Sequence, residues 1–76
     1  MSSTEIDDMI QLRRWIMTGE ARQIRMRAGA TQVEMARSLD ITAATVNRWE
    51  SRHQIPRGRN AREYHRILTR LSKVNA

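Results

Sequence analysis

The chain has 76 residues, enough for one small domain, and it holds two histidines and no cysteine. This composition excludes a disulfide framework and a thiolate metal site, and two isolated histidines are too few for a metal cage, so we expect neither metal nor cofactor. Fourteen basic residues, thirteen of them arginine, stand against eight acidic ones and give a formal net charge of +6.

No apolar run approaches the roughly 18 residues needed to span a membrane. The N-terminal segment also lacks the pattern of a signal peptide. We therefore expect a cytoplasmic, nucleoid-associated protein that makes no membrane contact.

A first helix is expected near residues 4–17. Its apolar residues occupy more than one side, so it needs burial on two faces. Thr18 and Gly19 interrupt it, and a second helix follows over about 20–28, ended by Gly29. A third helix over 31–38 opens with the capping box formed by Thr31 and Glu34.

A tight turn then leads to a fourth helix over 42–50, for which Thr42 is the N-cap. Asp40 lies where the chain must bend, and we predict a positive φ there because aspartate tolerates it better than most residues. Residues 51–59 form a loop, and Asn60 is expected to cap a fifth helix. The apolar face of that helix consists of Tyr64, Ile67, Leu68 and Leu71.

The charge is uneven along the chain. Residues 1–12 hold three acidic residues and no basic one, whereas residues 52–73 hold seven basic residues and one acidic residue. Guanidinium groups suit bidentate contacts to phosphate and to guanine. Such a local excess of arginine favours a nucleic acid as the partner. The alternative is a basic face that only keeps the protein soluble.

Two short helices around a tight turn are the pattern of a helix-turn-helix, in which the second helix lies in the major groove of DNA. In the helix over 42–50, Val46 and Trp49 are predicted to face inward. Arg48 is the best candidate for a bidentate contact to guanine, and Asn47 suits adenine or a phosphate. The predicted base-contacting residues are Ala43, Ala44, Thr45, Asn47 and Arg48. The alternative is an ordinary amphipathic helix with a solvated polar side.

A longer pattern surrounds this segment. It consists of Gly19-Glu-Ala-Arg-Gln-Ile-Arg25, Ala28-Gly-Ala-Thr-Gln32, Met35-Ala36, Leu39, Thr42, Val46 and Trp49-Glu50. The pattern resembles the lambda-repressor/Cro-like (XRE) helix-turn-helix domains, from residue 19 to about residue 71. The resemblance implies an all-α, compact five-helix lambda-repressor-like fold that binds double-stranded DNA. Residues 19–76 would form the DNA-binding domain, and residues 1–18 an extra N-terminal helix for packing or dimerisation.

The resemblance also assigns roles to residues. Gln32 is expected to contact a phosphate and to brace the first recognition residue, and Arg25 and Glu50 to form a semi-buried salt bridge beneath the recognition helix. The loop is expected to follow the DNA backbone, with Arg57 placed for the minor groove. The full set of predicted backbone contacts is Gln32, Thr42, Arg52, Arg57 and Arg59, and the predicted dimer contacts on the last helix are Tyr64, Leu68 and Leu71.

The sequence departs from the family pattern in three places. Asp40 stands where glycine is usual, and Ser51-Arg52 replaces a common Asn-Gly pair. Ala43 and Ala44 occupy leading recognition positions where glutamine or serine is frequent, which weakens direct hydrogen-bond readout. Specificity is then expected to depend on Arg48, on its polar neighbours and on DNA shape.

These features predict a sequence-specific transcriptional regulator, a small prophage or mobile-element repressor or Cro-like protein that binds an operator as a homodimer. No small-molecule ligand is expected, and the chain holds no catalytic constellation, so it is not expected to be an enzyme. The alternatives are an antitoxin or recombination-directionality factor with the same module, or a protein-interaction adaptor. The acidic N-terminal helix is also a possible handle for a protein partner.

Overall fold

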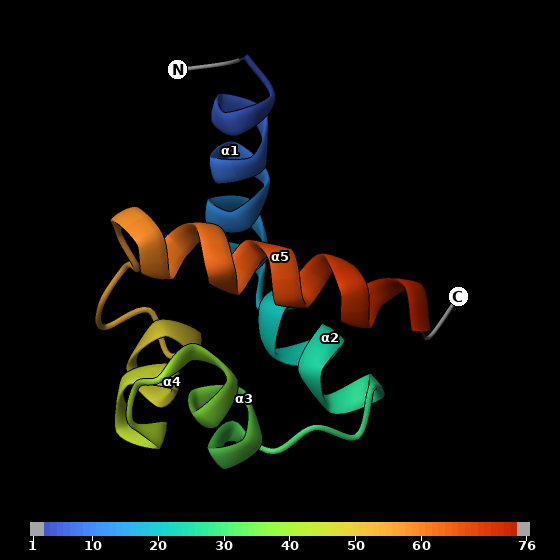
Figure 1. The fold of residues 1–76 in the computed structure, drawn as a ribbon, viewed down its shortest axis with the longest axis vertical. Helices are drawn as coiled ribbons and strands as arrows, with labels where there is room; N and C mark the ends of the chain where they lie inside the picture. Colours follow the sequence, from blue (N-terminus) through green and yellow to red (C-terminus); the bar gives the residue numbers. More distant parts are fainter. Residues whose placement is uncertain (1–2, 75–76) are drawn as a thin grey trace.

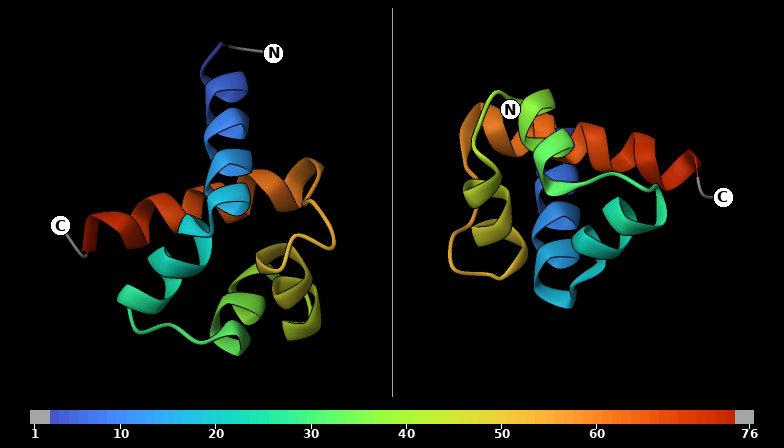
Figure 2. Two further views of the ribbon diagram at one scale, coloured as in Figure 1. Left: turned by 180° about the vertical axis from the view of Figure 1, so that it is seen from behind. Right: turned by 90° about the horizontal axis from the view of Figure 1, so that it is seen from below.

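The computed structural model describes residues 3–74, and within this range the chain forms five α-helices and no strand, so the all-α prediction is confirmed. The helices are α1 (Ser3–Thr18), α2 (Glu20–Arg27), α3 (Gln32–Leu39), α4 (Ala43–Glu50) and α5 (Gly58–Val74). Helix α5 crosses the middle of the molecule, with the N-terminal turns of α1 on one side and α2, α3 and α4 on the other (Figure 1). The view from behind in Figure 2 shows the same arrangement.

One hydrophobic core joins all five helices. Helix α1 contributes Leu12 and Ile16, which are 2% and 1% exposed, so the N-terminal helix packs into the same core as the helix-turn-helix. Helices α4 and α5 meet through Trp49 and Tyr64, whose ring centroids lie 4.9 Å apart. The remaining core residues are Ala21, Ile24, Met35, Ala36, Leu39, Val46, Ala61 and Leu68.

Side-chain hydrogen bonds fix where α3 and α4 begin. The hydroxyl of Thr31 accepts from the Glu34 backbone N–H at 3.0 Å, and the Glu34 carboxylate accepts from the Thr31 N–H at 2.9 Å, which completes the capping box. The hydrogen bond from the Thr31 backbone N–H lowers the pKa of Glu34, because it stabilises the charged carboxylate. The side chain of Thr42 caps α4 in the same way, accepting from the Thr45 N–H. The predicted start of the last helix at Asn60 is wrong, since α5 begins at Gly58.

Helices α2, α3 and α4 end in the same manner, each with a residue of positive φ. These residues are Gly29 (77°), Asp40 (56°) and Arg52 (65°). After each of them, the next N–H donates to the carbonyl five residues earlier, at 3.1, 3.0 and 2.9 Å. This is the Schellman motif, in which glycine is the usual residue. The positive φ predicted for Asp40 is confirmed, and Arg52 adopts the same left-handed conformation.

The strain at Arg52 gives a stability prediction. Replacing Arg52 with glycine is expected to raise the free energy of unfolding by about 0.5–1 kcal/mol. The left-handed conformation costs a residue with a side chain roughly 1–2 kcal/mol, and glycine avoids this cost. Part of the gain is lost because glycine has a larger conformational entropy in the unfolded chain. Urea unfolding of the wild type and Arg52→Gly measures the difference.

Arg57→Gly is the matched control. It removes the same charge from the same loop, but Arg57 does not have a positive φ. This variant is expected to lose stability. A gain in stability in both variants would mean that charge, not backbone strain, is responsible.

Candidate nucleic-acid interface

Helix α4 has one buried face and one open face. Val46 and Trp49 lie in the core, whereas Ala44, Asn47 and Arg48 are exposed. Thr45 is half-buried. Ala43 is half-buried and packs against the core. Three of the five predicted base-contacting residues are therefore exposed, and two are half-buried.

The side chain of Arg48 is held in place by its neighbours. Its guanidinium donates to the Thr45 hydroxyl at 3.2 Å and to the Gln54 side-chain carbonyl at 3.3 Å. Thr45 in turn shares a 2.9 Å hydrogen bond with the hydroxyl of the N-cap residue Thr42. The guanidinium group of Arg48 is therefore partly ordered on the open face of α4.

The sequence analysis did not identify Gln54. No pattern in the sequence marks it, because it reaches Arg48 only through the turn at Arg52. That turn directs the backbone N–H groups of His53 and Gln54 onto the Arg48 carbonyl, at 2.9 and 3.3 Å.

A buried ionic cluster lies beneath α4. Two guanidinium nitrogens of Arg25 donate to the two carboxylate oxygens of Glu50, at 2.6 and 3.1 Å, and a third donates to the Ala30 carbonyl at 2.8 Å. Arg25 and Glu50 are each only 8% exposed. The hydrogen bond to Glu50 raises the pKa of Arg25 above its ordinary value, so this guanidinium stays charged throughout the pH range of the folded protein.

Gln32 belongs to the same cluster. Its side-chain amide donates to Glu50 at 3.0 Å. It makes no bracing contact with the first recognition residue, because that residue, Ala43, has no polar side-chain atom. Gln32 and Asn47 line a hollow between α2, α3 and α4, together with Arg22, which the sequence analysis also missed. Arg22 could have been found from its position three residues before Arg25, because residues at this spacing are neighbours on a helix surface.

Arg52, Arg57 and Arg59 are all exposed, but they do not share one environment, and Arg59 belongs to the first turn of α5 instead of the loop. Arg52 and Arg57 line the same hollow between α4 and the loop, next to Thr45. Arg59 lies apart from them, in a hollow that also contains Asp40 and Glu63. The acidic neighbours make Arg59 a weaker candidate for a phosphate contact than Arg52 or Arg57. The buried residue Pro56 anchors this loop to the body of the protein.

Two of the predicted dimer contacts on α5 need correction. Tyr64 and Leu68 are both 0% exposed, because they complete the core of a single chain. A surface formed by them would require the core to open. Leu71 is half-buried and packs against the same core. Burial also raises the pKa of the Tyr64 hydroxyl, so this group remains neutral.

Comparison with protein families agrees with this geometry. The family model described as Helix-turn-helix matches residues 22–70, which cover α2 to most of α5. The chain belongs to the lambda-repressor/Cro-like (XRE) family of helix-turn-helix proteins, a DNA-binding family of the transcription-regulator type. Searches of curated proteins and of solved structures gave no match. Within residues 3–74 no helix has the length and apolar character needed to cross a membrane.

The buried ion pair leads to a second stability prediction. Arg25→Met is expected to lower the free energy of unfolding by about 3–5 kcal/mol, because it leaves the Glu50 carboxylate buried without its cation. The double variant Arg25→Met/Glu50→Leu is expected to recover most of this loss, since it removes both charges. Thermal and urea unfolding of the three proteins measures both effects.

The surface pair between Arg27 and Glu20 is the control. These side chains are 57% and 40% exposed, and Arg27→Met is expected to cost less than about 1 kcal/mol. A similar cost for Arg25→Met and Arg27→Met would contradict the special role of the buried cluster.

Proposed function

We propose that the protein is a sequence-specific regulator of transcription, a small repressor or Cro-like protein of a prophage or mobile element, and that it binds its operator as a homodimer. The main support for the proposal is the open face of α4. The Arg25–Glu50 contact holds this helix at a fixed angle, and the loop with Arg52 and Arg57 lies beside it. Regulation then results from occupancy of an operator that overlaps a promoter, and the site of action is the nucleoid in the cytoplasm.

Base readout in this proposal depends on few residues. Ala44 offers only a methyl group, which suits contact with a thymine methyl. Arg48 and Asn47 are the exposed hydrogen-bonding residues of the same face. Arg48 therefore provides the main direct contact, with a guanine edge in the major groove. Because Thr45 and Gln54 already order its side chain, less conformational entropy is lost on binding.

Affinity in the proposal comes mainly from phosphate contacts. Arg52 and Arg57 are exposed beside α4, and Arg22 and Gln32 lie at its other side. Contacts of this kind position the protein on DNA but carry no sequence information directly. In a dimer, the two α4 helices read two half-sites about one helical turn, roughly 34 Å, apart.

Selection of bound sequences from a random duplex pool tests the role of Arg48. The wild type is expected to enrich a palindromic sequence, and Arg48→Ala to lose the preference at one base position per half-site, at a cost of about 1–3 kcal/mol. Arg70→Ala, on the outer face of α5, is the control and is expected to keep the full preference. An equal loss of affinity for operator and random DNA in Arg48→Ala would exclude base reading by this residue.

Arg57 gives the complementary prediction. Arg57→Ala is expected to weaken binding to operator and random DNA alike, and to lower the slope of log affinity against log salt by about one. Titrations of both duplexes at several salt concentrations measure the two quantities. Weaker binding to the operator alone, with the salt slope unchanged, would contradict a phosphate contact.

A further inference from the structure

Helix α1 has a side that no other part of the described chain covers. Leu12 and Ile16 point into the core, whereas Ile6, Ile10 and Met17 are 46%, 44% and 61% exposed. These three residues follow one another at helical spacing along the face opposite the core. The first turns of α1 also extend beyond α5, away from the rest of the molecule (Figure 1).

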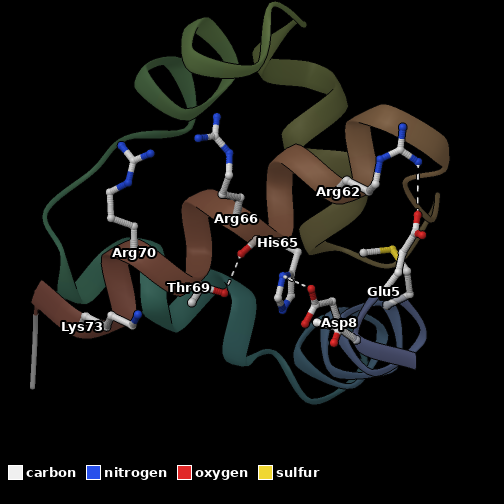
Figure 3. Close-up of a pocket in the computed structure, with 10 residues that line it drawn as sticks. Glu5, Asp8, Arg62, His65, Arg66, Thr69, Arg70 and Lys73 are labelled. Atoms are coloured by element: carbon white, nitrogen blue, oxygen red, sulfur yellow. Dashed lines mark hydrogen bonds and ion pairs between the residues drawn. The ribbon is translucent and has the colours of Figure 1, made fainter. Parts of the chain in front are cut away.

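Contacts with α5 fix the other side of α1. His65, which is buried, stacks on Trp15 with ring centroids 5.4 Å apart and has its Nδ1 4.0 Å from the Asp8 carboxylate. Arg62 lies 3.7 Å from Glu5. Figure 3 shows the contacts of His65 with Asp8 and of Arg62 with Glu5, where α1 and α5 meet. The orientation of α1 is therefore set, and its apolar outer face is presented to the surroundings.

The outer face of α1 also carries separated charges. Asp7 lies in the first half of the helix and Arg13 and Arg14 in the second half, and all three are exposed. No ion pair in the described part of the chain involves them. Asp7 and Arg14 are seven residues apart, so they lie on the same edge of the face but about 10 Å apart along the axis. They form no ion pair with each other in the structure, unlike Glu20 and Arg27, which have the same separation in α2 and do pair.

We propose that a second copy of this chain covers the outer face of α1, with the two α1 helices antiparallel about a two-fold axis at Ile10. In this register Ile10 meets Ile10 of the second copy. Asp7 of each chain lies beside Arg14 of the other, and Ile6 packs on the aliphatic part of Arg13. A two-fold axis forms each contact twice, because the same patch serves both chains.

The charge pattern selects the antiparallel arrangement. In a parallel pair the edge with Asp7 and Arg14 would face the edge with Ile6 and Arg13 of the second copy. Asp7 would then lack a cation, and Arg14 would lie beside Arg13, where like charges repel. Antiparallel helices pair opposite charges and also oppose their helix dipoles. The inference rests on the dimer of the proposed function and specifies its contact. Helix α1 lies outside the region matched by the family model, so this contact uses a part of the chain that the match does not include.

The test uses the full chain without DNA, in sedimentation equilibrium over a range of concentrations. The wild type is expected to dimerise, and Ile10→Glu to be monomeric over the same range. Met26→Glu is the matched control, because Met26 is an apolar residue of similar exposure, 49%, but belongs to α2 and not to the outer face of α1. It is expected to dimerise as the wild type does.

Charge reversal identifies the register. Asp7→Arg and Arg14→Asp are each expected to weaken self-association by roughly tenfold, since each places like charges together at two symmetric points. An equimolar mixture of the two variants is expected to form a heterodimer of wild-type strength, because every Asp7–Arg14 contact then joins opposite charges. Circular dichroism checks that each variant keeps the helix content of the wild type.

Three results would overturn the inference: a monomeric wild type, a dimer unaffected by Ile10→Glu, or a mixture that associates no better than its components. Failure here is distinguishable from failure of the proposed function. If the protein is a monomer but still selects a DNA sequence, the proposed α1 contact is wrong and the proposed DNA recognition stands. If it is a dimer that binds no DNA, the proposed contact stands and the proposed regulatory function is wrong.

Discussion

The buried carboxylate of Glu50 is the point on which the DNA-binding half of the molecule depends. It lies at the end of α4 and accepts hydrogen bonds from Arg25 of α2, at 2.6 and 3.1 Å, and from Gln32 at the start of α3, at 3.0 Å. A buried charge is tolerated only when such partners satisfy it. Three helices are therefore tied to one another by directional bonds, in addition to apolar packing that has no directional preference.

The same cluster limits which hydrogen-bonding groups the open face of α4 offers. The amide of Gln32 is engaged with Glu50, and Ala43 packs partly against the core. The hydrogen-bonding capacity of the open face of α4 therefore lies toward its C-terminal half, at Asn47 and Arg48. The left-handed turn at Arg52 completes this arrangement, because it returns the chain so that Gln54 reaches Arg48.

Sequence reasoning succeeded where the determinants are local. The caps at Thr31 and Thr42 and the positive φ of Asp40 involve contacts within a few residues, and the structure has them all. It failed at the start of α5, where the Arg57 carbonyl already accepts the first helical hydrogen bond, from Ala61 at 3.4 Å. The pattern at Asn60 was a plausible cap, but the chain was helical two residues earlier.

The sequence by itself determined five helical segments and the N-caps of α3 and α4. It also indicated the pairing of Arg25 with Glu50, through a family resemblance, and the exposed arginines beside α4. The tertiary structure decided which apolar helix faces are buried and which other helices bury them. The periodicity of α5 marks Tyr64 and Leu68 as apolar-face residues but does not say whether the covering surface belongs to the same chain. The crossing of the other helices under α5 buries both completely, and leaves Ile6 and Ile10 of α1 in the open. Burial is a property of surfaces that meet across long sequence separations, which no local pattern records.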